Sequence, residues 1–105
     1  MADTSEPVVR DNPAQKRFEV LLDDEVAGFT TYQTVAGAVA FMHTEIDERF
    51  EGQGLGSTLV RRALNDVRDR GLDVLPYCPF VRAYIRRHRE YVDLVPADMR
   101  HRFEL

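Results

Sequence analysis

Hydrophobic and polar residues alternate along the first half of the chain, a pattern typical of β-strands. Every second residue from 18 to 22 is apolar, the pair Asp23–Asp24 then marks a turn, and residues 26–32 are rich in β-branched and aromatic side chains. Residues 38–46 form a further extended stretch with apolar side chains on both faces. The pattern predicts a hairpin followed by a third strand that lies centrally in a sheet.

The second half of the chain changes to helical spacing. Apolar residues between Gly56 and Val67 fall on one stripe with polar ones opposite, and Gly71 is suited to end that helix. Residues 72–78 indicate a short buried strand, and Pro79 suits the first position of a second helix that runs to about residue 89. Strands, helix, strand and helix in this order predict an α/β (α+β) fold with a mixed sheet and a crossover helix.

The two ends of the chain differ from its centre. Residues 1–15 are mostly polar and predict a flexible N-terminal lead-in, whereas residues 16–105 predict a single domain. A chain of 105 residues with 44% hydrophobic content is long enough for one core and too short for two. The segment after Val92 mixes apolar residues with prolines and charges, and its pattern predicts no definite element.

Charge and composition exclude several classes of function. The chain has 14 basic and 18 acidic residues and a net charge of −4, which argues against nucleic acid as the main partner. It contains neither an apolar run of membrane-spanning length nor a signal-peptide pattern, so we expect no membrane partner and a cytoplasmic location. The single cysteine, Cys78, cannot form an internal disulfide.

Three glycines within five positions precede the first predicted helix, in the stretch "EGQGLGSTLV". Glycines at 52, 54 and 56 allow positive φ and close approach of a ligand, and the free amides at a helix start attract anions such as phosphate. A tight turn without a ligand is the alternative. The loop lacks the lysine of a Walker A motif, and Ser57 stands where a dinucleotide fingerprint needs a third glycine.

Four segments in order, "RFEV", "HTEI", "GQGLGSTLV" and "CPFVRAYIRRHREY", resemble the short single-domain GNAT-like N-acetyltransferases over roughly residues 11–95. The resemblance implies a mixed, mostly antiparallel sheet flanked by two helices, with acetyl-CoA or coenzyme A as cofactor. The family's pyrophosphate loop has Gln or Arg, two residues, Gly, one residue, and Gly or Ala. It implies that the cofactor is bound by Glu51, Gly52, Gln53, Gly54, Leu55, Gly56 and Ser57.

One residue departs from the family's loop pattern. Glu51 stands where the family has Gln or Arg, and a carboxylate beside a diphosphate weakens binding by repulsion. We expect reduced cofactor affinity, unless Glu51 faces solvent or pairs with Arg49 or Arg62. A separate stripe of Arg82, Arg86 and Arg89 could either meet the 3′-phosphate of coenzyme A or simply face water.

Acetyl transfer to an amine needs a base for the amine and an acid for the leaving thiolate. Cys78 precedes a predicted helix, whose dipole favours a thiolate, so it is a candidate nucleophile or acid; a buried structural cysteine is the alternative. His43 and Glu45 share a strand face with Phe41 and are candidate bases, or a structural pair. The resemblance implies a tyrosine acid, with Tyr84 the candidate and Tyr77 its rival. No spaced set of metal ligands is present.

These observations favour an acyltransferase that moves an acetyl group from acetyl-CoA to an amine of a small molecule or peptide. The alternative is a coenzyme A-binding or protein-interaction module with little catalysis, and a nucleotide-binding enzyme is a third hypothesis. Only a short segment joins the first two predicted strands, so we expect an open acceptor cleft. Both a monomer and a homodimer are compatible with the sequence.

Overall fold

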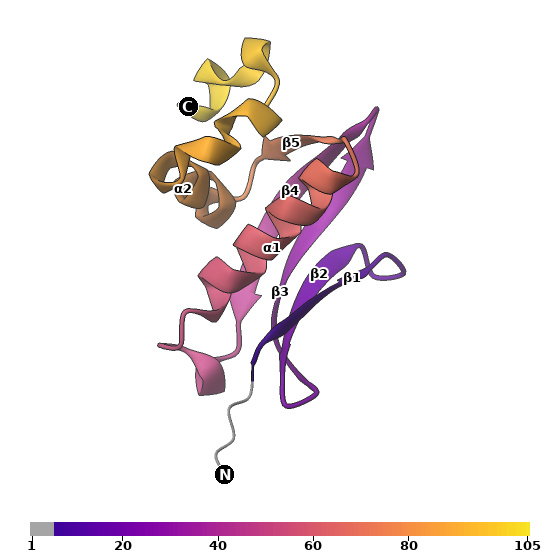
Figure 1. The fold of residues 1–105 in the computed structure, drawn as a ribbon, viewed down its shortest axis with the longest axis vertical. Helices are drawn as coiled ribbons and strands as arrows, with labels where there is room; N and C mark the ends of the chain where they lie inside the picture. The colour runs from indigo at the N-terminus through magenta and orange to yellow at the C-terminus, as the bar shows by residue number, and fades with distance from the viewer. Residues whose placement is uncertain (1–5) are drawn as a thin grey trace.

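The computed structural model describes residues 6–105 and has a five-stranded sheet in the order β1-β2-β3-β4-β5 (Figure 1). Neighbouring strands among the first four are antiparallel, and β5 pairs with β4 in parallel. The strands are β1 (Val8–Asn12), β2 (Arg17–Leu22), β3 (Glu25–Val35), β4 (Ala38–Ile46) and β5 (Asp73–Pro76). The predicted mixed, mostly antiparallel sheet is confirmed.

Two α-helices follow the spacing that the sequence predicted. Helix α1 (Leu55–Asp69) crosses one face of the sheet, and α2 (Pro79–Arg87) lies beside it near β5 (Figure 1). The apolar stripe of α1, which includes the fully buried Leu59, Leu64 and Val67, packs into the core. The other helical segments are short 3₁₀ helices: η1 (Glu48–Phe50), η2 (Arg89–Leu94), η3 (Ala97–Met99) and η4 (His101–Phe103).

The predicted N-terminal lead-in is wrong for residues 8–12, which form β1 and pair along their whole length with β2. Asp11 holds this strand in place: the Tyr32 hydroxyl donates to its carboxylate at 2.6 Å, and Arg70, the C-cap residue of α1, donates at 2.9 Å. Burial, together with this bond to an acceptor, raises the pKa of Tyr32 to about 12. Residues 1–5 of the predicted lead-in lie outside the described residues.

The outer face of the sheet, opposite α1, contains a buried carboxylate. The side chain of Glu19 in β2 is only 2% exposed and accepts hydrogen bonds from Arg10 (3.0 Å), Asn12 (3.0 Å) and Arg17 (2.8 Å). Burial alone would raise the pKa of Glu19, but these three hydrogen bonds outweigh it and hold the pKa below its ordinary value. None of the described helices covers this face over β1 to β3, and the arginine side chains shield it instead.

A β-bulge changes which residues of β4 face the core. Tyr32 of β3 pairs with Phe41, but Thr31 pairs with His43, so Met42 is an extra residue in β4. After the bulge, Thr44 rather than His43 shares the buried face with Phe41, and its hydroxyl donates to the buried Thr30 at 2.9 Å. The prediction that Phe41 shares a face with His43 and Glu45 is therefore wrong.

Strand β5 pairs with β4 along its whole length, but β4 is longer and extends beyond β5. Their pairing runs from Ala38 opposite Asp73 to Phe41 opposite Pro76, and the last link is a hydrogen bond from the Cys78 amide to the Phe41 carbonyl at 2.8 Å. Beyond it β4 continues to Ile46 while the chain after β5 turns into α2. The edge of β4 that faced β5 is therefore unpaired over its last five residues, next to the start of α1.

Candidate active site

The glycine loop forms the N-terminal end of α1, and two of its glycines have a backbone conformation that other residues avoid. Gly52 has φ +86° and Gly54, the residue that caps α1, has φ +73°. An added Cβ at either position would meet no atom within 4 Å. These two glycines are needed for their positive φ and not for lack of space.

Gly56 serves a different purpose. A Cβ at this position would lie 2.7 Å from Cζ of Phe80, so the absence of a side chain lets the first turn of α1 contact the first turn of α2. Phe80 remains 41% exposed and can move. An alanine at Gly56 would therefore displace the ring slightly without disrupting the loop.

The loop presents a row of free backbone donors. The amides of residues 52–57 have no hydrogen-bond partner within residues 6–105, whereas the next amide, of Thr58, donates to the Gly54 carbonyl at 3.2 Å. No side chain caps α1. The donors lie at the positive end of a helix of 15 residues, so the arrangement suits an anion with several oxygens, such as a diphosphate.

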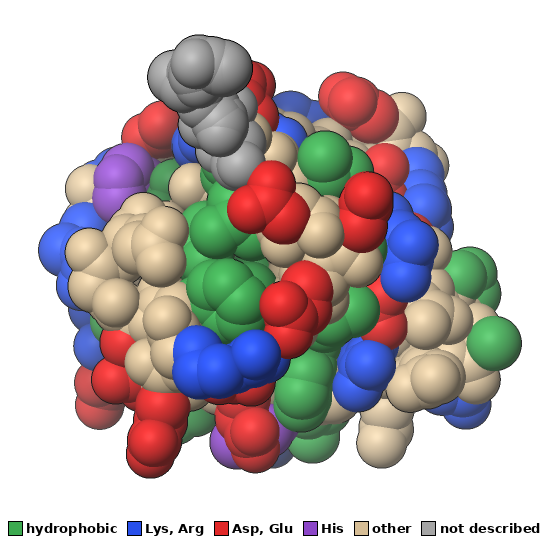
Figure 2. Space-filling model, turned by 90° about the horizontal axis from the view of Figure 1, so that it is seen from below, with side chains coloured by type: hydrophobic (Ala, Val, Ile, Leu, Met, Phe, Trp, Pro, Cys, Tyr) green, Lys and Arg blue, Asp and Glu red, His purple; other side chains and the backbone are tan. Residues whose placement is uncertain are grey.

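An apolar groove adjoins these donors. It has a volume of about 320 Å³ and is lined by the side chains of Ile46, Phe50, Leu55 and Phe80 together with the loop itself. Figure 2 views the end of the molecule from which the loop projects, and it shows hydrophobic side chains exposed between acidic and basic ones. The groove connects the anion site to the unpaired end of β4.

Glu51 lines the same groove and is exposed. Arg49 binds Glu25 and Asp47, and Arg62 binds the carbonyl of Pro7, so neither pairs with Glu51. Glu51 makes no ion pair with any residue from 6 to 105. Its charge therefore lies beside the free amides of the loop, without compensation from any residue between 6 and 105.

Cys78 caps the N-terminus of α2 where β4 and β5 separate. It is 2% exposed, and its Sγ lies 3.2 Å from Oγ1 of Thr44. Thr44 in turn bonds to Thr30, so the thiol ends a short chain of hydroxyl groups that leads into the core. The thiol is therefore buried and does not lie on the surface.

His43 and Glu45 lie on one face of β4, as the sequence predicted, and their side chains contact each other. His43 Nε2 and Glu45 Oε2 lie 2.8 Å apart, and both side chains are about 60% exposed. Because neighbouring side chains of a strand point to opposite faces, this pair lies on the outer face while Thr44 and Cys78 lie on the helix face. The structure brings the predicted bases together but separates them from the thiol, and the catalytic roles of all three stay predictions.

Tyr84 lies in α2 and is 3% exposed. Its ring stacks on His88 with centroids 4.0 Å apart and tilts against Tyr91 at 6.0 Å. Burial, together with the nearby Tyr91, raises the pKa of Tyr84. The rival acid, Tyr77, is 41% exposed and contacts Phe103 edge to face at 5.1 Å, so it is the more accessible of the two.

A sequence profile of the GCN5-related N-acetyltransferase family matches residues 17–94. The chain belongs to this family. A solved structure with the same fold is the solution structure of a GCN5-like protein from Staphylococcus aureus, named as a candidate N-acetyltransferase. The two share 19% sequence identity with a TM-score of 0.64, over 84% of this chain and 86% of the other. We found no match among curated proteins.

This member of the family has side chains at its candidate site that sequence reasoning did not single out. Phe80 links the glycine loop to α2, and Thr44 contacts the thiol of Cys78. A single Phe or Thr at these positions belongs to no recognisable sequence motif, because both roles depend on contacts between segments that are far apart in the chain. The β-bulge that places Thr44 on the same face as Cys78 likewise cannot be predicted from the hydrophobic pattern of β4 alone.

Residues 6–105 were also searched for a metal site and for a membrane-spanning helix. Within residues 6–105 no three His, Cys, Asp or Glu side chains are grouped so that they could hold a metal ion. None of the helices in that range is long and apolar enough to cross a bilayer.

Proposed function

We propose that this protein transfers an acetyl group from acetyl-CoA to an amine. The observation that carries the proposal is the row of unpartnered amides at residues 52–57 beside an apolar groove. Backbone donors at a helix start suit the diphosphate of coenzyme A, and the groove suits its flexible, largely uncharged arm. Family membership of residues 17–94 supports acyl transfer in general.

The cofactor supplies an acetyl group activated as a thioester, and the remaining work falls to side chains of the protein. The loop orients the donor, and Cys78 lies just after β5, where the pairing of that strand with β4 has ended. Tyr77, Tyr84 and the Cys78 thiol are candidate acids for the leaving sulfur. His43 and Glu45 remain the candidate bases for an acceptor amine that approaches from the outer face.

The acceptor is proposed to be an amine of a small molecule or of a peptide. None of the described helices covers the outer face of the sheet over β1 to β3, which leaves room for either. We propose a cytoplasmic protein that acts as a monomer or homodimer, which sedimentation of the purified chain can determine.

A coenzyme A-binding module without useful catalysis is the second candidate, and two observations favour it. The charge of Glu51 at the mouth of the anion site weakens cofactor affinity, and the predicted base pair lies on the opposite face from Cys78. A module of this kind would bind coenzyme A and release no thiol.

The test has two parts. Titration with acetyl-CoA, followed by amide resonances, should move the signals of residues 52–57 if the loop binds the cofactor. Incubation with acetyl-CoA and a panel of amines, with free thiol measured by a chromogenic reagent, then separates enzyme from module. Mass spectrometry of Cys78 for an acetyl adduct tests its role as nucleophile. Unmoved resonances at millimolar ligand would remove the proposal.

A further inference from the structure

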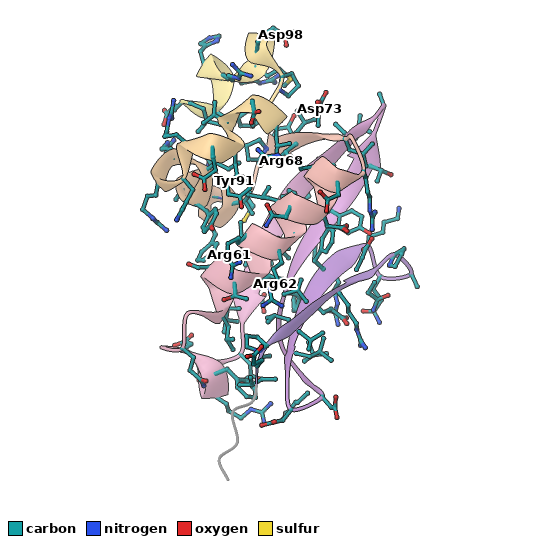
Figure 3. All side chains as sticks on the ribbon, in the orientation of Figure 1. Arg61, Arg62, Arg68, Asp73, Tyr91 and Asp98 are labelled. Atoms are coloured by element: carbon teal, nitrogen blue, oxygen red, sulfur yellow. The ribbon has the colours of Figure 1, made fainter. Side chains whose placement is uncertain are left out.

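The two ends of α2 are fastened in different ways. Beyond its C-terminal end the chain is bonded to α1, where the Tyr91 hydroxyl donates to Asn65 at 2.9 Å. Arg68 of α1 also donates to the Glu90 carbonyl at 2.7 Å. Figure 3 shows Arg68 and Tyr91 between α1 and the turns that follow α2. At the start of α2 the connection runs to β4 instead, and Cys78 makes it.

Cys78 contacts β4 through both its backbone and its side chain. Its amide donates to the Phe41 carbonyl at 2.8 Å, and its Sγ lies 3.2 Å from Oγ1 of Thr44. Although Cys78 is the N-cap residue of α2, its thiol makes no capping hydrogen bond with that helix. The sulfur is therefore bonded to the strand and not to the amides of the first helical turn.

The hydrogen shared by Thr44 and Cys78 belongs to the thiol. A hydroxyl group has a single hydrogen, and Thr44 donates its own to Oγ1 of Thr30 at 2.9 Å. Toward the sulfur, Thr44 therefore offers only lone pairs, and the hydrogen between the two groups has to come from S–H. A thiolate in this place would face an oxygen lone pair at 3.2 Å without a donor.

Strand pairing fixes both threonines. Thr30 and Thr44 are directly opposite each other in the register of β3 and β4, and Thr30 is fully buried. The extra residue at Met42 brings Thr44 to the thiol, because without it His43 would occupy the helix face of β4. An imidazole beside the sulfur could take its proton and make it nucleophilic, whereas a threonine hydroxyl does not act as such a base.

We propose that Thr44, supported by Thr30, is a positioning residue that holds Cys78 as a neutral thiol, with the S–H group donated to Thr44. In this state Cys78 fastens the start of α2 to β4 and does not carry the acetyl group. Phe80, two residues further on, lines the groove beside the glycine loop, so the same link sets the position of one groove wall. That Cys78 carries no acetyl group rests on the proposed function, whereas the direction of its S–H bond does not.

The first experiment measures the S–H stretching band of the full chain by infrared spectroscopy. Cys78 is the single cysteine, so the band reports on this thiol alone. Because donation of a hydrogen bond weakens the S–H bond, we expect the wild-type band at a lower wavenumber than the band of Thr44→Val. Thr44→Ser retains a hydroxyl and should restore the wild-type position. Thr31→Val is the matched control, since Thr31 lies on the other face of β3 from Thr30 and should leave the band unchanged.

The second experiment follows the acetyl group. Wild-type protein incubated with acetyl-CoA should show no acetyl adduct on Cys78 by mass spectrometry. Cys78→Ser keeps a hydrogen-bond donor and should release thiol in the amine panel at a rate within about tenfold of wild type, the effect of one altered hydrogen bond. Loss of a covalent nucleophile would instead cost several orders of magnitude.

Each outcome decides one of the two statements. Equal band positions in wild type and Thr44→Val, or an equal shift in Thr31→Val, would overturn the direction of the S–H bond. An acetyl adduct, or loss of turnover in a folded Cys78→Ser, would make the thiol a nucleophile and overturn the second statement. If wild-type protein neither binds coenzyme A nor releases thiol, the proposed function is wrong, and the infrared comparison still decides where the hydrogen lies. Thermal unfolding checks each variant, and Thr44→Ala replaces Thr44→Val in the comparison if the latter does not fold.

Discussion

Gly54 and Gly71 bracket α1 and offer a matched pair of substitutions. Their φ angles are +73° and +72°, and an added Cβ at either would meet no atom within 4 Å. A left-handed conformation costs a residue with a side chain about 1–2 kcal/mol, partly offset by the restricted unfolded chain. We therefore expect Gly54→Ala and Gly71→Ala to lower the free energy of unfolding equally, by about 1 kcal/mol, with a fall in Tm of about 4–8 °C.

Binding should distinguish the two variants. In Gly54→Ala, the backbone relieves its strain by moving away from the positive φ, which rotates the free amides that follow residue 54. Gly71 lies at the other end of α1, where its amide donates to the Arg68 carbonyl at 2.9 Å, so its replacement leaves the loop amides in place. Loss of one hydrogen bond to a charged group costs about 1.5–3 kcal/mol. We expect Gly54→Ala to weaken coenzyme A binding about tenfold or more in calorimetry, and Gly71→Ala to leave it unchanged.

Two results would refute this reasoning. Wild-type affinity in Gly54→Ala, alongside the expected fall in Tm, would mean that the loop amides do not hold the cofactor. An equal loss of affinity in both variants would mean that binding depends on the general stability of α1 and not on the local direction of its first donors.

Three further predictions concern single side chains. Glu51→Arg should tighten coenzyme A binding severalfold in calorimetry; unchanged affinity would show that the carboxylate faces away from the cofactor. Glu19→Gln should lower the free energy of unfolding by about 2–4 kcal/mol at pH 7. Because the folded pKa of Glu19 is depressed, its contribution is present above the unfolded pKa and lost as pH falls through the folded one. The difference between the urea curves of variant and wild type should therefore shrink as pH falls below the unfolded pKa of about 4.3 and vanish below the folded pKa. Tyr32→Phe removes the bond to Asp11 and should cost about 1 kcal/mol in the same assay; no loss would mean that this bond does not stabilise β1.

The elements with a strong local period could be predicted from the sequence. The strand at residues 38–46 matches β4 in both bounds, and α1 is the helix that the stripe from Gly56 to Val67 indicated. The spacing of hydrophobic residues identifies these elements, because a strand or helix that buries one face places apolar residues at its own structural period. β1 lacks such a signal, since it is short and polar and is held by Tyr32 and Arg70, which lie far along the chain.

The candidate site, too, has one part that the sequence predicts and one part that it does not. The glycine loop was recognisable because positive φ and free amides are properties of a short local segment. The relation of His43 and Glu45 to Cys78 was not, because a single extra residue at Met42 exchanges the two faces of β4 beyond it. The register of β4 is set by its pairing with β3, so it cannot be predicted from the sequence of β4 alone.

The uncovered outer face of the sheet bears on how this protein can change over generations. Replacing an exposed side chain there, unlike the buried Glu19, opens no void in the interior, since the hydrophobic cluster lies on the side of α1. The exposed positions around His43 can therefore diversify while the fold and the loop persist. Relatives built on this plan should differ most in the chemistry of that open surface and, with it, in the molecules they recognise.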